Sequence, residues 1–203
     1  MLGNTLISYI LAILFVLGAY ALGSISSAYI VTKLFLGQDI RKMGSGNVGS
    51  TNALRVVGIK GAIIVLIIDI GKGFLAAWLG TILLNSLFGV IMGTAAVFGH
   101  VFPFWLNFKG GKGAATAFGF LLAIWPLAAF IIILAWALII LISRYVSLAT
   151  IAAAILAVIF GFWSRLDPLA IIVMDIAFLL VLLRHKDNIG RLLRKEESKL
   201  GRN

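Results

Sequence analysis

The chain has 203 residues, of which 62% are hydrophobic and 12% are charged. A soluble domain carries about 45–50% apolar and about 25% charged residues, so this chain has too few polar groups to cover a surface that faces water. We therefore expect an integral membrane protein. The 17 lysines and arginines outnumber the 7 acidic residues, which gives a net charge of +10, and the absence of cysteine excludes disulfides and thiolate metal sites.

The apolar stretches predict membrane spans. The first charge is Lys33, and the stretch before it lacks the basic start and short apolar core of a signal peptide. About 20 apolar residues cross a bilayer, so this stretch predicts a retained, tilted first span. We expect seven spans and a tail. The spans cover residues 3–34, 57–83, 87–102, 113–125, 127–143, 147–163 and 168–184, and the tail covers 185–203 with a cytoplasmic helix that has a basic face.

Residues 113–143 carry no charge and could form one span or two. One helix of this length would run for about 46 Å, which exceeds the hydrocarbon core of about 30 Å. The pair Trp125-Pro126 lies near the middle, and a proline usually ends a helix at the residue before it. Two short spans therefore fit better than one.

The basic residues predict the orientation. With seven spans, fifteen of the seventeen fall on one side of the membrane, while Arg165 falls on the other and Lys72 lies within a span. The positive-inside rule places the basic side in the cytoplasm. The fold class we expect is an all-α integral membrane protein: one polytopic domain of seven transmembrane helices, with the N-terminus outside and the C-terminus in the cytoplasm.

Polar side chains gather at span ends on this basic side, first at residues 44–55. The glycines there permit a turned backbone whose N–H groups converge on an anion. Ser45, Asn47 and Asn52 can add hydrogen bonds, and Arg55 offers a bidentate fork that suits phosphate. A flexible loop that ends in a helix cap is the alternative.

A second polar group covers residues 99–113. The run Gly110-Gly111-Lys112-Gly113 opens a helix, which is typical of a phosphate cradle with an ammonium beside it. The G-x-x-x-x-G-K-[ST] pattern is absent from the sequence, so hydrolysis of nucleoside triphosphates has no support. His100 is surrounded by apolar residues, which favours a structural, hydrogen-bonded histidine.

A third group covers residues 184–191, where the last span ends. His185 and Asn188 share a helical face there, and the histidine could exchange a proton or bind phosphate. A solvated interface residue is the alternative for His185. Ser147 belongs to a fourth polar end on the same side.

The remaining charges are more typical of structural roles. Asp69 and Lys72 lie three residues apart in an apolar stretch and are expected to pair, although intramembrane charges are functional candidates by default. Asp175 has no partner nearby in the sequence. Two histidines and scattered carboxylates predict no metal site, and basic groups that border the membrane argue against nucleic-acid binding.

The polar groups at 45–55, 99–113 and 184–188, in this order, resemble the three motifs of the bacterial acyl-phosphate:glycerol-3-phosphate acyltransferase family, PlsY type. The resemblance covers nearly the whole chain, with Ser50 where alanine is common. It implies a multi-pass protein of the bacterial inner membrane whose three motifs form one site that faces the cytoplasm.

The resemblance also implies a reaction without a cofactor. A long-chain acyl group moves from acyl phosphate to the 1-hydroxyl of glycerol 3-phosphate, which yields 1-acyl-glycerol 3-phosphate and phosphate in the first acylation of phospholipid synthesis. The partners are the two substrates and membrane lipids, and the oligomeric state stays open. The implied catalytic residues are His185, Ser45 and Asn188; the phosphate-binding residues are Arg55, Lys112, Asn47, Asn52 and Ser147; and Gly110, Gly111 and Gly113 cradle the acyl phosphate.

The base stays open between His185 and the donor's own phosphate, and we expect the second because no carboxylate in the motifs is placed to orient the histidine. The alternative function is a small transporter for phosphate-bearing metabolites, which would account for the basic groups and for the pair Asp69 and Lys72. Transporter sites usually lie near the midplane of the membrane. The polar groups here gather at one face, so the transferase fits better.

Overall fold

A computed structural model describes residues 2–164 and 166–201, and there it contains helices, turns and loops only. Arg165 and Arg202, which the topology prediction uses, lie outside the described residues. The helices are α1 (Leu2–Gly23), α2 (Ser27–Leu36), η1 (Ile40–Lys42), α3 (Ser50–Leu83), α4 (Ser86–Val101), η2 (Phe104–Leu106), α5 (Ala114–Ile124), α6 (Pro126–Ser143), α7 (Val146–Trp163), α8 (Pro168–Leu183) and α9 (Lys186–Leu193).

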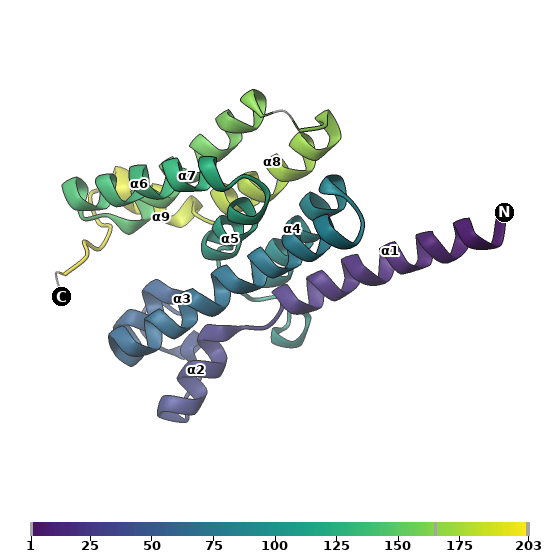
Figure 1. Ribbon diagram of the computed structural model, residues 1–203. Coiled ribbons are helices and arrows are strands. Elements are labelled where there is room, and N and C mark those ends of the chain that lie inside the picture. Colours follow the sequence, from purple (N-terminus) through teal and green to yellow (C-terminus); the bar gives the residue numbers. More distant parts are fainter. Residues whose placement is uncertain (1, 165, 202–203) are drawn as a thin grey trace.

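Helix α3 is the centre of the bundle. It packs against α4 and α5, α4 also packs against α1 and α8, and α6, α7 and α8 pack in chain order beside them, while the N-terminal half of α1 extends away from the rest (Figure 1). Glycines allow the close contact of α3 with α5: a Cβ on Gly73 would collide with the carbonyl oxygen of Thr116, and one on Gly119 with that of Ile70. Small residues permit such approaches without any hydrophobic drive from lipid.

The first predicted span is wrong as a single helix, because the structure divides it into α1 and α2 at residues 24–26. The carbonyl groups that this break leaves free are bound by other elements. The indole N–H of Trp105 donates to the carbonyl of Ser24, and the ammonium of Lys72 donates to that of Ile25 at 2.8 Å. Irregular backbone at membrane depth is tolerated where protein buries it and satisfies its hydrogen bonds.

Helix α3 begins at Ser50, within the expected polar break. Its backbone departs from helical geometry at Gly58, where φ is +75°, and the helix beyond this kink agrees with the second predicted span, 57–83. Glycine tolerates this left-handed conformation without the steric cost of a Cβ. The break at Trp125-Pro126 is present, since α5 ends at Ile124 and α6 begins at Pro126.

Several helices are suited to a membrane. Four segments are long and apolar enough to cross one, namely Leu6–Leu36, Ser86–Leu106, Pro126–Ser143 and Val146–Trp163, and α8 with α9 makes a fifth if the pair counts as one span across its 49° bend. The chain is thus an all-helical integral membrane protein over its described residues. Seven spans and the orientation of the termini stay predictions.

The tail folds back on the bundle. The predicted helix of the last twenty residues is confined to α9, and beyond it Lys195 has a φ of +59° that turns the chain. The N–H of Leu200 then donates to the carbonyl of Arg144 at 2.7 Å, in the turn between α6 and α7. The tail is therefore held to the bundle at Leu200, although most of its residues are exposed.

Candidate anion-binding site

The loop before α3 is shaped by the side chain of Asn52, which is 1% exposed. Its Oδ1 accepts from the N–H of Ser45 at 2.9 Å, and its Nδ2 donates at 3.0 Å to the carbonyls of Met43 and Asn47. Gly44 makes room for the amide, because a Cβ there would collide with Oδ1, and its φ is +56°. Asn52 therefore shapes the loop through both ends of its amide, and its contact with phosphate stays a prediction.

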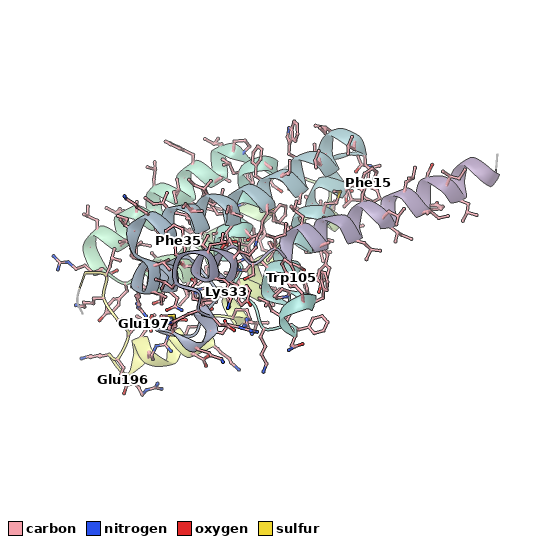
Figure 2. All side chains as sticks on the ribbon, turned by 90° about the horizontal axis from the view of Figure 1, so that it is seen from below. Phe15, Lys33, Phe35, Trp105, Glu196 and Glu197 are labelled. Carbon is pink, nitrogen blue, oxygen red and sulfur yellow. The ribbon has the colours of Figure 1, made fainter. Side chains whose placement is uncertain are left out.

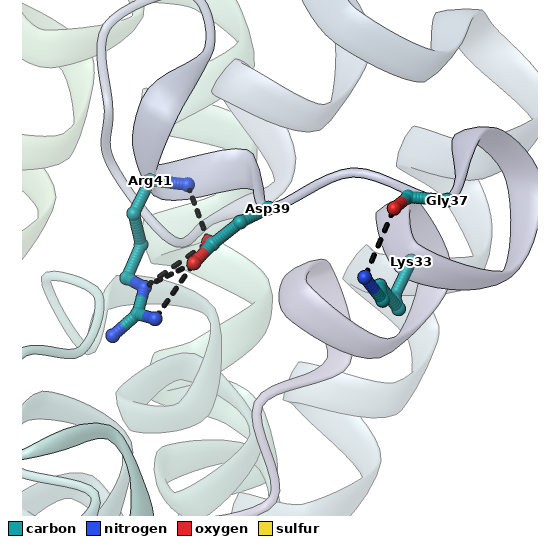
Figure 3. Close-up of polar contacts among 4 residues, drawn as sticks. All are labelled: Lys33, Gly37, Asp39 and Arg41. Carbon is teal, nitrogen blue, oxygen red and sulfur yellow. Dashed lines mark hydrogen bonds and ion pairs between the residues drawn. The ribbon is translucent and has the colours of Figure 1, made fainter.

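The segment that leads into this loop holds its own charges. Asp39 accepts from the N–H of Arg41 at 3.0 Å and pairs with its guanidinium at 2.7 Å, while Lys33 donates to the carbonyl of Gly37 at 2.9 Å (Figure 3). The hydrogen bond from Arg41 lowers the pKa of the Asp39 carboxyl. Arg41 and Lys33 are thus bound by neighbours in the sequence. Arg55 is the cation that we expect to bind phosphate on this loop and helix.

The second loop packs directly against the first at Gly111. A Cβ on Gly111 would collide with Nε2 of His100 and would lie 2.5 Å from the carbonyl oxygen of Val48. The N–H of Gly111 donates to the carbonyl of His100, and that of Gly110 to the carbonyl of Val101, each at 3.1 Å. These contacts bring the first two predicted groups together.

Gly113 precedes α5 with a φ of +83°, a conformation that L side chains rarely adopt. The loop therefore reaches the positive N-terminus of α5 immediately after Lys112, which is a favourable place for an anion. Burial and the charge of Arg191 lower the pKa of the Lys112 ammonium.

Lys112 joins the second group to the third. Its ammonium makes a short hydrogen bond to Oδ1 of Asn188, whose side chain is 5% exposed. The Nδ2 of Asn188 donates in turn to Oε1 of Glu197 at 2.7 Å, and Oε2 of Glu197 pairs with Nε of Arg191 at 2.6 Å. The result is a continuous polar chain from the glycine-rich loop to the tail.

Glu197 is a residue that the sequence analysis missed. It stands among alternating charges that are typical of a solvated segment, yet its side chain is only 8% exposed, whereas that of Glu196 is 56% exposed. Both lie at the end of the molecule where α9 is found (Figure 2). Burial opposes the ionisation of Glu197, but hydrogen bonds from Asn188 and Arg191 keep the pKa of its carboxyl below the usual value.

His185 is buried between α8 and α9. Its Nδ1 lies 2.7 Å from the carbonyl oxygen of Val181, so the proton of a neutral ring resides on Nδ1 and leaves Nε2 as an acceptor. Burial and the nearby charge of Lys112 lower the pKa of His185 to about 4. The ring is therefore neutral at pH 7, and it can accept a hydrogen bond from a hydroxyl but is a weak base.

The other predicted site residues differ in exposure. Ser45 and Arg55 are exposed and Asn47 is half-buried, while Ser147 is buried at the start of α7. The structure thus supplies an exposed hydroxyl on the first loop, an exposed arginine in the first turns of α3, and a half-buried lysine with a buried asparagine and histidine behind the second loop. Among the described residues, no group of three histidine or carboxylate side chains lies close enough to hold a metal ion.

The predicted pair of Asp69 and Lys72 is confirmed, with 2.8 Å between Nζ and Oδ1. His100 joins it, because its Nδ1 lies 3.4 Å from the same oxygen. His100 therefore has the buried polar partner that a structural histidine needs, and its role stays a prediction.

The comparisons with known proteins agree with this geometry. A family model described as glycerol-3-phosphate acyltransferase matches residues 13–195. Glycerol-3-phosphate acyltransferase of Finegoldia magna is 40% identical over 97% of this chain and 100% of its own, and that of Shewanella woodyi is 45% identical over 92% of both.

Two crystal structures of PlsY (YgiH), an integral membrane glycerol 3-phosphate acyltransferase, also match. The glycerol 3-phosphate form has a TM-score of 0.89 at 40% identity, over 94% of this chain and 96% of that one. The lysophosphatidic acid form has a TM-score of 0.86 at 38% identity, over 94% and 95% of the two chains.

The fold and the site define a membrane-embedded acyltransferase of lipid synthesis. The chain belongs to the glycerol-3-phosphate acyltransferase family, and PlsY is a structurally characterised relative. Membership of this family argues against the transporter alternative.

Proposed function

We propose that the chain transfers a long-chain acyl group from acyl phosphate to the 1-hydroxyl of glycerol 3-phosphate, with 1-acyl-glycerol 3-phosphate and inorganic phosphate as products. The observation that carries the proposal is the hydrogen bond between Lys112 and Asn188, which joins a glycine-rich anion cradle to a buried polar chain beside His185. Two phosphate-bearing substrates need two adjacent anion sites, and the first loop offers the second of them through Arg55.

In the proposed step, the hydroxyl oxygen of glycerol 3-phosphate attacks the acyl carbon, and the bond from that carbon to the phosphate oxygen breaks. The phosphate leaves with the bonding electron pair and accepts the hydroxyl proton. Gly110, Gly111 and Gly113 let the backbone approach the donor phosphate at the N-terminus of α5, and Lys112 neutralises its growing charge. The acyl phosphate is already activated, so positioning and charge stabilisation are sufficient and no acyl-enzyme forms.

His185 and Ser45 are proposed to orient the acceptor hydroxyl, with Asn188 beside them, while Arg55, Asn47 and Ser147 complete the phosphate contacts. Asn52 acts through the loop whose carbonyls and N–H it binds. The low pKa of His185, about 4, supports the donor phosphate as the base, because a ring of this basicity gains little by taking the proton at neutral pH. A phosphate monoester has a second pKa near about 6, which suits the task better.

The test uses purified protein in detergent with long-chain acyl phosphate and glycerol 3-phosphate. We expect phosphate and lyso-lipid to form in equal amounts, and Lys112→Gln to abolish most of the turnover. Lys109→Gln is the matched control, because Lys109 lies in the same loop and is exposed. Uptake of glycerol 3-phosphate into liposomes without turnover would refute the proposal and restore the transporter.

We also propose seven spans in the bacterial inner membrane, with the N-terminus outside and the site facing the cytoplasm. The chain has no cysteine, so single Ser→Cys variants report sidedness without background. Ser198→Cys in the tail should react only from the cytoplasmic side, and Ser86→Cys at the start of α4 only from the outside. Labelling of both from one side would contradict the topology.

A further inference from the structure

One buried carboxylate collects donors from three helices. Oδ1 of Asp69, in α3, accepts from Oγ of Ser27 in α2 at 2.8 Å and from Nζ of Lys72 at 2.8 Å, and Nδ1 of His100 in α4 lies 3.4 Å away. Asp69 is 1% exposed, Lys72 4% and His100 8%. These four residues form the Asp69 cluster.

The Asp69 cluster reaches the break between α1 and α2. Nζ of Lys72 donates to the carbonyl of Ile25 at 2.8 Å as well as to Asp69. Taking two charges out of water costs free energy that their attraction often only offsets, so a buried ion pair is weak evidence for added stability. What the cluster does provide is a fixed position for each group that it binds.

The group it fixes nearest to the anion site is the imidazole of His100. With Nδ1 turned toward Asp69, the opposite edge of the ring, at Nε2, lies against the α-carbon of Gly111 so closely that a Cβ would collide with it. The carbonyl of the same histidine accepts from the N–H of Gly111 at 3.1 Å. The imidazole ring therefore packs directly against the glycine-rich loop at Gly111. If the ring rotated, the loop would lose this contact and could move.

We propose that Asp69 is a positioning residue for the anion cradle: it holds His100 in the orientation that supports Gly111, and thereby sets the positions of Lys112 and of the N-terminus of α5 around the donor phosphate. Asp69 itself touches no substrate. The inference rests on the proposed function. A cluster that served stability alone would change the unfolding temperature and leave the KM for acyl phosphate as it is.

The first variant is Asp69→Asn combined with Lys72→Gln, which removes both charges together and keeps an amide that can donate to Ile25. We expect the KM for acyl phosphate to rise about tenfold, with kcat changed less than about threefold. Asp175→Asn is the matched control, since Asp175 is the half-buried carboxylate of α8, and its KM should equal that of the wild type.

The second variant separates the two edges of the imidazole. His100→Asn keeps an N–H donor near the position of Nδ1 and removes the edge that faces Gly111, so its KM should also rise about tenfold. Adding the Asp69 and Lys72 changes to His100→Asn should raise KM little further, because the charges act through the ring that is already lost. Multiplication of the two effects would overturn the inference.

Binding is measured without turnover by titrating a non-transferable acyl phosphonate into each variant in a calorimeter. A roughly tenfold loss of affinity for the phosphonate in Asp69→Asn/Lys72→Gln, with wild-type affinity in Asp175→Asn, supports the inference. It does so even if the acyl donor proves to be another anionic lipid. Equal affinity in wild type and variant overturns it, whether or not the unfolding temperature falls. A wild type that binds the phosphonate but transfers no acyl group would refute the proposed function alone.

Discussion

The neighbouring residues Glu196 and Glu197 offer a controlled test of the tail. Each carboxylate pairs with an arginine at about the same distance, 2.7 Å to Arg194 and 2.6 Å to Arg191, but the side chains are 56% and 8% exposed. Glu197 also accepts from Asn188. The substitutions Glu197→Gln and Glu196→Gln therefore make the same chemical change in a buried and in an exposed setting.

The two variants should differ in stability. A hydrogen bond to a charged group contributes about 1.5–3 kcal/mol, and the 40% exposure of the Arg191 side chain places the loss in Glu197→Gln near the lower end, at about 1.5 kcal/mol. At about 2–4 °C per kcal/mol for a chain of this size, the unfolding midpoint falls by about 3–6 °C. The exposed pair of Glu196 contributes below about 0.5 kcal/mol, so Glu196→Gln lowers the midpoint by less than about 2 °C.

The first measurement is thermal unfolding in detergent, monitored by intrinsic fluorescence. The second is the KM for each of the two substrates. Because the folded-state pKa of Glu197 is lowered, its stabilisation is present above the unfolded-state pKa of about 4.3 and is lost as pH falls through the folded-state pKa. Glu197→Gln should lack that part of the acid sensitivity. It should also raise the KM of one substrate about fivefold, or about 1 kcal/mol, because a neutral amide oxygen accepts the hydrogen bond of Asn188 more weakly than the carboxylate does. Equal behaviour of the two variants would refute the reasoning.

Two further predictions concern the cradle and the base. In Gly111→Ala the added methyl group must displace His100 or the carbonyl of Val48, an overpacking cost of about 1–3 kcal/mol, and the KM for acyl phosphate should rise at least fivefold; Gly71→Ala, where a Cβ meets nothing within 4 Å, should leave it unchanged. A rise confined to the KM for glycerol 3-phosphate would assign the loop to the acceptor instead. For His185→Ala, a limb of the pH–rate profile near about 6 should persist, because it belongs to the donor phosphate. Disappearance of that limb, with substrate binding intact, would identify His185 as the base.

Much of the helical pattern could be predicted because local signals mark the helix ends. Pro126 and Pro168 each occupy the first position of a helix, and the side chain of Asn85 caps α4. The break at residues 24–26 could not be predicted in this way. It lies in an uncharged stretch, and the partners that satisfy it, Trp105 and Lys72, come from elements that follow it by many residues.

The site residues that stand in short sequence motifs could be predicted. The glycine-rich loops, Lys112 and Asn188 were all expected, and the structure joins Lys112 to Asn188 directly. Glu197 was missed because its burial depends on the turn at Lys195 and on the contact of Leu200 with the α6–α7 turn. The amide of Asn52 binds the loop rather than pointing away from it, which no spacing rule distinguishes.

The fold-back of the tail has a consequence for the order of events in biosynthesis. Chains emerge from the ribosome N-terminus first, so helices α1 to α9 are all made before Glu197, the carboxylate that anchors Asn188 and thereby the partner of Lys112. The bundle can enter the bilayer while the anion cradle still lacks this support. A site that depends on Glu197 is therefore completed only when nearly the whole chain has been made.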